Sequence, residues 1–190
     1  MSSKILIFNG SPRKKGNSNF LVGKVTEGIL EADKDAKIEV FNLHSMDIAP
    51  CKACDACRTE KREGKYCVIK DDMADLYEKL VKAKAIVLVT PIYWFTVTAQ
   101  TKLFMDRLYG LYTEKTKSLK DKPIGAVLVY GDSDSNTSGV FNAIGSLKDA
   151  FGYTGSIIKG IVHGSANAIG DAAKNASLCE DAYNLGKTLL

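Results

Sequence analysis

Apolar residues along this chain gather in short runs that alternate with amphipathic stretches. Five runs have the length and composition of buried parallel strands, and they cover residues 4–9, 37–43, 85–90, 124–130 and 155–162. The other stretches repeat apolar residues at helical spacing, which predicts helices over residues 19–32, 71–84, 98–109, 140–151 and 170–189. This alternation predicts an α/β fold with a parallel sheet, helices on both faces and right-handed crossovers.

Two common folds share this order of elements, the flavodoxin-like sandwich and the longer dinucleotide-binding fold. The chain has five strand–helix units and no G-x-G-x-x-G motif, which favours the first of these folds. We therefore predict a three-layer flavodoxin-like sandwich with a five-stranded parallel sheet in the order 2-1-3-4-5. At 190 residues, the sandwich would take up the chain as a single domain, residues 1–190.

Residues 44–70 show no sustained periodicity and contain most of the cysteines. Of the five cysteines in the chain, four lie here: Cys51, Cys54, Cys57 and Cys67. We predict a cysteine-rich loop inserted at about residues 48–70 on the ligand-binding face, because a long loop inside a compact domain usually serves function.

Composition and charge narrow the class of protein. The chain is 45% hydrophobic and 25% charged, as in ordinary globular proteins. No stretch approaches the roughly 18 apolar residues of a membrane span, and the first residues, MSSKILIFNGS, indicate a strand and not a signal peptide. A net charge of +4 with scattered lysines gives little support to nucleic-acid binding. We expect a cytoplasmic protein with an acidic or phosphate-bearing small ligand, and neither a nucleic acid nor a membrane as partner.

The loop after the first strand, Gly10 to Asn19, is rich in groups that bind anions. It combines hydroxyls, amides and basic side chains with the backbone N–H groups of a helix start. Ser11, Asn17 and Ser18 would donate hydrogen bonds to a terminal phosphate, and Arg13 would offset its charge. The alternative is a plain polar turn between strand and helix.

The cysteine set indicates metal or redox chemistry, because a reducing cytoplasm disfavours disulfides. Cys51, Cys54 and Cys57 are spaced by two residues, and with Cys67 they supply the four thiolates that an iron–sulfur cluster needs. A structural zinc site with four sulfurs and a loop without metal remain alternatives. The stretch 58–66 lengthens the loop that must close on Cys67, at an entropic cost that grows only logarithmically.

Three segments of the chain resemble one group of proteins. NGSPRKKGNSN, residues 9–19, closely resembles the phosphate loop GSPR-x-x-GN-[ST] of the NADPH-dependent FMN reductase and iron–sulfur flavoprotein families. TPIYWFTVTAQTKLFMDR, residues 90–107, is similar to their T-P-x-Y…K…DR segment, and residues 129–153 resemble their fourth-strand loop and following helix. The resemblance therefore runs almost to the C-terminus, in the same order.

The resemblance implies that FMN binds across the carboxyl ends of the first, third and fourth strands. It implies a set of phosphate-binding residues in the first loop: Ser11, Arg13, Asn17, Ser18 and Asn19. It assigns the isoalloxazine ring to the turn formed by Pro91, Ile92, Tyr93 and Trp94. Gly131 would form the third wall, where a glycine lets the backbone approach the ring. As an alternative, Tyr93 and Trp94 are core or interface aromatics, with Trp94 the one expected to face outward.

In the iron–sulfur flavoproteins, a compact cysteine set carries a [4Fe-4S] cluster. Cys67 followed by Asp71-Asp72-Met73 resembles their C-x-x-x-D-D-M ending, although the gap before Cys67 is longer here. We interpret Asp71 and Asp72 themselves as helix caps. The resemblance also implies a homodimer or homotetramer, with the cysteine loop of one subunit near the flavin of another.

These observations predict an FMN-binding oxidoreductase or electron-transfer flavoprotein, linked to NAD(P)H or ferredoxin, that passes electrons to a [4Fe-4S] cluster or an external acceptor. The flavin carries the chemistry, so no catalytic side chain is predicted. Lys102, Asp106 and Arg107 are expected to be structural or interface residues. One alternative is a non-enzymatic flavodoxin-like electron carrier. Another is a metal or redox sensor whose cysteine loop responds to oxidant.

Overall fold

A parallel sheet forms the centre of the computed structural model, which describes residues 3–59, 66–112 and 118–190. Its long strands follow the order β2-β1-β3-β5-β6, and all four of their pairings are parallel. These strands are β1 (Lys4–Asn9), β2 (Lys37–Asn42), β3 (Ala85–Tyr93), β5 (Pro123–Tyr130) and β6 (Ile157–Ser165). The predicted strand order 2-1-3-4-5 and the flavodoxin-like architecture are confirmed.

A sixth strand, β4 (Thr96–Val97), adds a short hairpin that the sequence did not predict. Instead of turning at Pro91, β3 continues to Tyr93 and pairs antiparallel with β4. Trp94 and Phe95 form the tip, with left-handed φ values of 47° and 66°. A hairpin turn with two positive φ values normally takes Asn-Gly, and bulky residues are strained there. Over the described residues the sheet is therefore six-stranded, where five strands were predicted.

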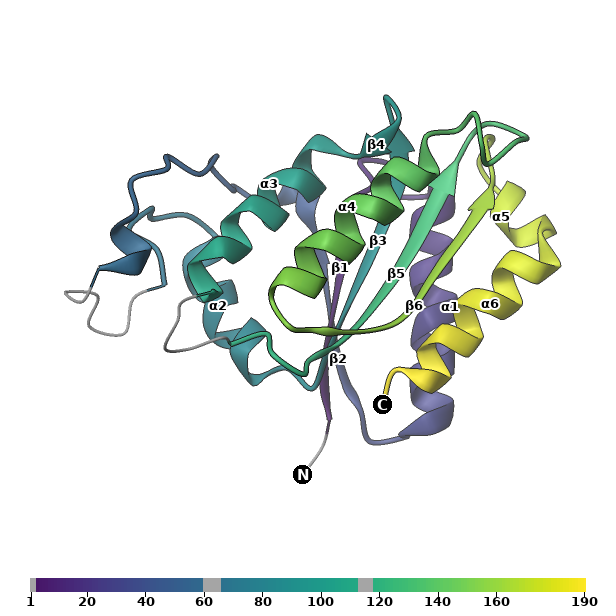
Figure 1. Ribbon diagram of the computed structural model, residues 1–190. Coiled ribbons are helices and arrows are strands. Elements are labelled where there is room, and N and C mark those ends of the chain that lie inside the picture. Colours follow the sequence, from purple (N-terminus) through teal and green to yellow (C-terminus); the bar gives the residue numbers. More distant parts are fainter. Residues whose placement is uncertain (1–2, 60–65, 113–117) are drawn as a thin grey trace.

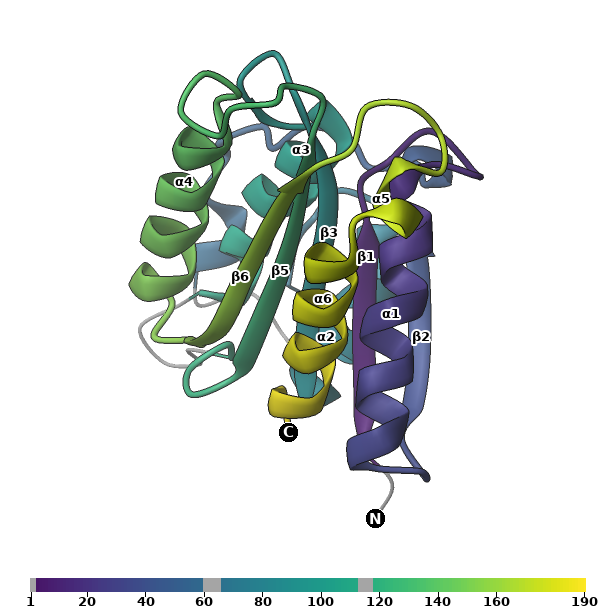
Figure 2. The ribbon, with the colours of Figure 1, turned by 90° about the vertical axis from the view of Figure 1, so that its right-hand side faces the viewer.

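Helices cover both faces of the sheet (Figures 1 and 2). One face carries α1 (Asn17–Ala32), α5 (Asp171–Lys174) and α6 (Ala176–Thr188), and the other carries α2 (Met73–Lys82), α3 (Ala99–Arg107) and α4 (Val140–Tyr153). The predicted last helix is divided at Asn175, whose side chain accepts a hydrogen bond from the N–H of Leu178 and caps α6. Among the described residues, three short 3-10 turns cover Leu43–Ser45, Ala56–Arg58 and Leu108–Leu111.

Alternate residues of each strand pack into separate cores on the two faces. In β1, Leu6 and Phe8 belong to the core under α2, α3 and α4, while Ile5 and Ile7 belong to the core under α1 and α6. All four are fully buried, and each contributes about 1.5–3 kcal/mol of burial free energy. This packing fixes the carboxyl ends of the parallel strands at one edge, where the loops after β1, β3, β5 and β6 meet at the top of Figure 1. Among the described helices, none is both long enough and apolar enough to cross a membrane.

Candidate functional site

The first loop is clamped to β3 and α3 at Gly10. Its N–H donates to the carbonyl of Val89 (2.8 Å). Its own carbonyl accepts from Oγ1 of Thr98 (2.9 Å) and Nε2 of Gln100 (2.6 Å). A Cβ atom on Gly10 would lie 1.9 Å from Oγ1 of Thr101, closer than any side chain can approach. Only a glycine therefore lets the loop leave β1 at this point.

Three buried threonine hydroxyls hold the end of β3 against the start of α3. Thr90, Thr98 and Thr101 are each at most 1% exposed. Oγ1 of Thr98 lies 2.8 Å from Oγ1 of Thr101, which donates to Oγ1 of Thr90 at 3.2 Å. This cluster was not predicted from the sequence. The signal that could have indicated it is one threonine at the end of a strand and two more at the start of the next helix. The cluster fixes the β3–β4 hairpin relative to the first loop.

Asn9 and Asn19 shape the first loop from within. Oδ1 of the buried Asn9 accepts from the N–H of Ser11 (3.0 Å), and its Nδ2 donates to Oδ1 of Asn19 (2.6 Å). Asn19 in turn donates to the carbonyl of Lys14 (2.5 Å). Oγ of Ser11 accepts from the N–H of Arg13 (3.2 Å). The side chains of Asn9, Ser11 and Asn19 therefore hold the loop in one conformation. The contribution of Asn9 was not predicted from the sequence.

The side chain of Asn17 is engaged away from the loop. Its Nδ2 donates to the carbonyls of Ala166 (3.0 Å) and Ala168 (2.9 Å). Its Oδ1 accepts from the N–H groups of Gly170 and Ala172, both at 3.2 Å. These four bonds use both amide hydrogens and both oxygen lone pairs. The expectation that Asn17 donates to a phosphate stays a prediction. What the structure shows is that its side-chain amide is a latch between α1 and residues 166–172.

The start of α1 presents to the loop backbone donors that have no acceptor within the helix. Hydrogen bonding within the helix begins where the N–H of Phe20 donates to the carbonyl of Gly16 (3.2 Å). The N–H groups of residues 17–19 therefore have no acceptor within the helix. No acidic residue lies in this first turn, Ser18 is buried beside it, and Arg13, Lys14 and Lys15 are exposed next to it. Free donors, the helix dipole and basic side chains together suit a phosphate group.

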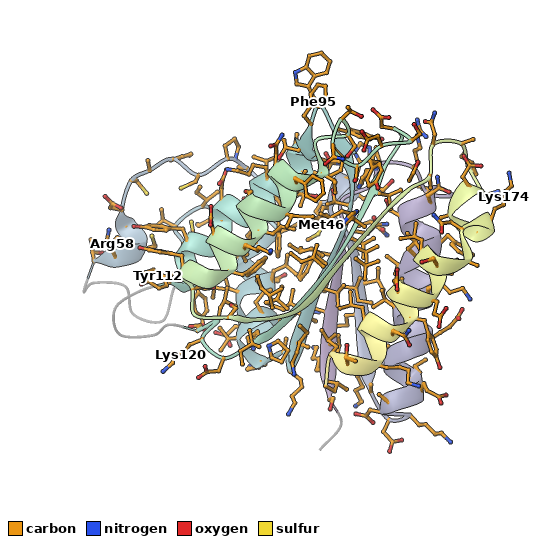
Figure 3. The ribbon with its side chains drawn as sticks, turned by 45° about the vertical axis from the view of Figure 1, so that its right-hand side comes forward. Met46, Arg58, Phe95, Tyr112, Lys120 and Lys174 are labelled. Atoms are coloured by element: carbon orange, nitrogen blue, oxygen red, sulfur yellow. The ribbon has the colours of Figure 1, made fainter. Side chains whose placement is uncertain are left out.

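The β3–β4 hairpin stands at the rim of this site, with Phe95 at the end of the molecule in Figure 3. Nδ2 of Asn142 on α4 donates to the carbonyl of Phe95 (3.2 Å), and a Cβ atom on Gly139 would lie 2.4 Å from Cα of Phe95. Pro91 and Ile92 are half-buried. Trp94 is 91% exposed and Tyr93 is 42% exposed, so Trp94 faces outward, as expected. The tip is strained but firmly supported by α4.

The loop after β5 forms the third side of the site. Gly131 is exposed at the end of the strand, and Asp132 follows it. Oδ2 of Asp132 accepts from Oγ1 of Thr137 (2.9 Å), and its Oδ1 accepts from the N–H of Asp134 (3.2 Å). Because the Asp134 N–H and the Thr137 hydroxyl stabilise the charged form, the pKa of Asp132 lies below its usual range. The loop is thus ordered by its own carboxylates.

The cysteine loop projects from the side of the fold next to α2 and α3 (blue in Figure 1). Cys51 and Cys54 are exposed, and Cys57 and Cys67 are half-buried. Within residues 3–59, 66–112 and 118–190, no three His, Cys, Asp or Glu side chains are grouped closely enough to hold a metal ion. The four thiols match a cluster in number and type, but their described positions do not assemble the site.

Arg58 ties this loop to the 3-10 turn after α3. Its Nη1 donates to the hydroxyl of Tyr109 (2.9 Å), and its guanidinium lies 6.0 Å from the centre of the Tyr109 ring. In Figure 3, Arg58 lies on the same side of the molecule as Tyr112 and far from Lys174. The loop is therefore anchored to the α3 side of the sandwich.

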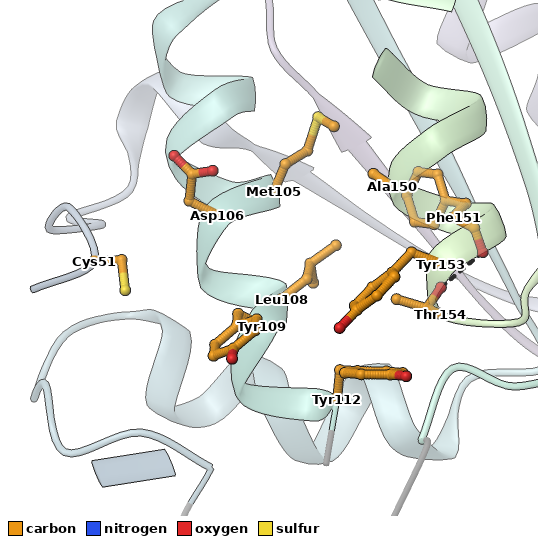
Figure 4. Close-up of a pocket in the computed structure, with 10 residues that line it drawn as sticks. All are labelled: Cys51, Met105, Asp106, Leu108, Tyr109, Tyr112, Ala150, Phe151, Tyr153 and Thr154. Atoms are coloured by element: carbon orange, nitrogen blue, oxygen red, sulfur yellow. Dashed lines mark hydrogen bonds between the residues drawn. The ribbon is translucent and has the colours of Figure 1, made fainter. Parts of the chain in front are cut away.

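A pocket of about 360 Å³ lies between the cysteine loop, the end of α3 and the end of α4 (Figure 4). Tyr109, Tyr112 and Tyr153 contribute aromatic walls, with the Tyr112 and Tyr153 ring centres 4.5 Å apart. Cys51 lines the pocket from the loop side. None of the predicted residues of the first loop, the hairpin or Gly131 lines it, so this pocket is separate from the site at the strand ends.

Sequence comparison connects the chain with flavin enzymes. The family model described as NADPH-dependent FMN reductase matches residues 3–168. An iron-sulfur flavoprotein from Methanosarcina thermophila is 34% identical over 157 residues, which cover 83% of this chain and 77% of the relative. A second, from Methanocaldococcus jannaschii, is 32% identical over 192 residues, covering 97% of this chain and 94% of the relative. The alignments with two further iron-sulfur flavoproteins, from Archaeoglobus fulgidus and M. jannaschii, span 62% of the length of each relative.

Comparison of structures agrees on the architecture. The NAD(P)H:quinone oxidoreductase from Methanothermobacter marburgensis superposes with a TM-score of 0.75, at 20% identity, over 100% of this chain and 96% of that chain. At this identity the likeness shows a shared fold. The sequence matches carry the assignment of family.

Proposed function

Since this chain belongs to the NADPH-dependent FMN reductase family and is therefore an FMN-dependent oxidoreductase, we propose that NAD(P)H reduces an FMN bound by the loops at the strand ends. Bound FMN would accept the hydride that NAD(P)H gives up and return its two electrons to an acceptor, singly or together. The protein's own part is to bind, orient and shield.

The start of α1 carries this proposal. The FMN phosphate would be held by the N–H groups of residues 17–19, which have no acceptor within the helix. It would also accept hydrogen bonds from the hydroxyls of Ser11 and Ser18, and Arg13 would offset its charge. The side chains of Asn17 and Asn19 would not contact the phosphate themselves, since their amides hydrogen-bond the surrounding backbone. We propose that they shape the phosphate site by holding the loop.

The hairpin and the β5 loop would flank the isoalloxazine ring. Thr90 of the threonine cluster donates to the carbonyl of Pro91, and Ile92 pairs with Val97 of β4. We propose that this fixed stretch of backbone lies along the polar edge of the ring. Tyr93 and the outward-facing Trp94 would limit access of water and donor from the rim. Gly131, with no side chain, would let the β5 backbone approach the opposite side.

We further propose that Cys51, Cys54, Cys57 and Cys67 ligate a [4Fe-4S] cluster, with the loop closing around it. The number and type of ligands support this proposal, as do the relatives named iron-sulfur flavoproteins. A ferredoxin-type protein would then be an alternative electron donor. A homodimer or homotetramer would place this loop near the flavin of another subunit.

The test is anaerobic purification followed by a spectrum, iron and sulfide analysis, and steady-state oxidation of NAD(P)H with a quinone or free flavin as acceptor. We expect flavin bands near roughly 375 and 450 nm and continuous turnover. Flavin without any turnover would overturn the enzyme proposal in favour of an electron carrier. Flavin with turnover but without iron would overturn only the cluster proposal.

A further inference from the structure

The cysteine loop leaves and re-enters the fold at a single closed neck. Ala49 stands before the first cysteine and Asp71 after the last, and the N–H of Ala49 donates to Oδ2 of Asp71 (2.9 Å). Arg107 bridges the two: its Nη1 donates to the carbonyl of Ala49 (2.8 Å) and to Oδ2 of Asp71, and its Nη2 donates to Oδ1 of Asp71 (3.1 Å). One guanidinium therefore holds both ends of the loop.

The pair is deeply buried and remains charged. The side chains of Arg107 and Asp71 are only 1% and 2% exposed. Burial alone would raise the pKa of Asp71, but the hydrogen bonds from Arg107 and from the Ala49 N–H outweigh it and hold that pKa below its usual range. Burial would likewise lower the pKa of Arg107, yet Asp71 keeps it above its usual value. A pair of apolar side chains at these two positions could stabilise the fold equally well. What the Arg107–Asp71 pair adds is a fixed geometry, because the guanidinium donates to both carboxylate oxygens.

Further contacts fix the end of the loop that carries Cys67. The side chain of Cys67 interacts with the Tyr77 hydroxyl, and that hydroxyl donates to the backbone carbonyl of Arg107 (2.9 Å). The ring centres of Tyr66 and Tyr77 lie 5.3 Å apart. Asp71 also accepts from the N–H of Met73 (3.1 Å), so one carboxylate serves both the neck and the start of α2.

Helix α3, which ends at Arg107, contacts the first loop at its other end. Arg107 is the last residue of α3, and Thr98 and Gln100 at its start hold the carbonyl of Gly10. Nine residues of helix rise about 12 Å between first and last Cα atoms. A single rigid helix thus connects the start of the first loop to the neck of the cysteine loop.

We propose that Arg107 is the positioning residue of the cysteine loop: it closes the loop on Ala49 and Asp71 and, through α3, sets the distance of the four thiols from the first loop. The neck is formed by contacts among this chain's own residues. Its consequence for a cluster rests on the proposed function.

The test compares a double variant, Arg107→Met with Asp71→Leu, with a matched control, Lys102→Gln with Asp106→Asn. The control removes an exposed ion pair on the same helix. Hydrogen exchange and labelling of the cysteine thiols are measured on protein freed of metal, with flavin absorbance as the check on the fold. We expect at least about tenfold faster exchange at residues 47–51 and 71–73 in the double variant, together with faster labelling of Cys67. We expect no such change in the control.

Arg107→Lys provides a second variant that keeps the charge but loses the bidentate fork; we expect intermediate exchange at the neck. Exchange and thiol labelling at wild-type rates in a folded, flavin-binding double variant or in Arg107→Lys would overturn the proposal. If the double variant does not fold, Arg107→Lys decides the question. If wild-type protein binds iron, we expect the variants to bind less; if it binds none, the cluster proposal fails, and the exchange rates still test the neck.

Discussion

The carboxamide of Asn17 at the start of α1 accepts a hydrogen bond from the N–H of Ala172, 155 residues away, at 3.2 Å. With its other three bonds, to Ala166, Ala168 and Gly170, it joins the first loop to the segment after the last strand. The side chain of this asparagine, which lies in the segment that resembles a phosphate loop, therefore holds two distant parts of the fold together. The latch explains how a short polar loop stays in place without an apolar core of its own.

Replacing Asn17 with alanine should therefore lower stability before it affects ligand chemistry. The change leaves the buried carbonyl of Ala166 and the buried N–H of Ala172 without the partner that Asn17 supplies, which we expect to cost about 2–4 kcal/mol of unfolding free energy. Urea unfolding of the flavin-free protein measures this loss. Asn184→Ala, which removes an exposed amide on α6, is the control and should change stability by less than about 0.5 kcal/mol. Unchanged stability with a large loss of FMN affinity would instead make Asn17 a direct ligand.

Gly10→Ala should disrupt the first loop, because the new methyl group would meet three buried threonine hydroxyls, the closest at 1.9 Å. We expect FMN affinity to fall by at least about tenfold as the backbone shifts, measured by titration of the flavin-free protein. Gly23→Ala is the matched control, because a Cβ atom there meets nothing within 4 Å. That change should leave affinity intact and stabilise α1 by about 0.5–1 kcal/mol. Equal affinity in both variants would show that the clamp at Gly10 is not needed.

The features that could be predicted from the sequence are those encoded by local patterns. Apolar runs such as residues 85–90 marked the strands, and the polar stretch from Gly10 to Asn19 marked the loop and helix start after β1, because strand periodicity and turn chemistry act over a few residues. The β3–β4 hairpin was missed because Trp94-Phe95 contradicts the normal rule for its turn. The turn is supported by Gly139 and Asn142, which lie far along the chain.

Contacts between distant residues explain the rest of what was missed. Asp71 was interpreted as a helix cap, and it does accept from the N–H of Met73, but its main partner is Arg107, 36 residues away. Nothing in either residue's neighbours indicates that pairing. The predicted stretch 58–66 falls largely on residues 60–65, outside the described part of the chain.

Arg13→Ala should weaken the binding of FMN without changing that of riboflavin. Arg13 is exposed beside the start of α1, where its charge would act on the phosphate and not on the ring system. We expect the Kd for FMN to rise about three- to tenfold at low salt and the difference to shrink at high salt, since screening weakens exposed charges. Fluorescence titrations with both ligands measure this. Lys174→Ala, an exposed cation on α5, is the control. An equal loss for riboflavin would place Arg13 at the ring and not at the phosphate.

The buried pair at the neck predicts how stability depends on pH. The folded-state pKa of Asp71 is depressed, because hydrogen bonds from Arg107 and from backbone N–H groups outweigh the effect of burial. A depressed carboxyl pKa contributes stability that is fully present above the unfolded-state value of about 3.9 and is lost as pH falls through the folded-state value. Wild-type protein should therefore lose unfolding free energy as the pH drops below about 4, measured by urea unfolding across pH 2.5–7.

Asp71→Asn should be less stable at neutral pH and show a shallower decline in acid. Asp72→Asn, at the exposed neighbouring carboxylate, should retain the wild-type slope in this range. Parallel curves for wild type and Asp71→Asn would mean that the pair does not govern acid stability, and that its role is confined to the geometry of the cysteine loop.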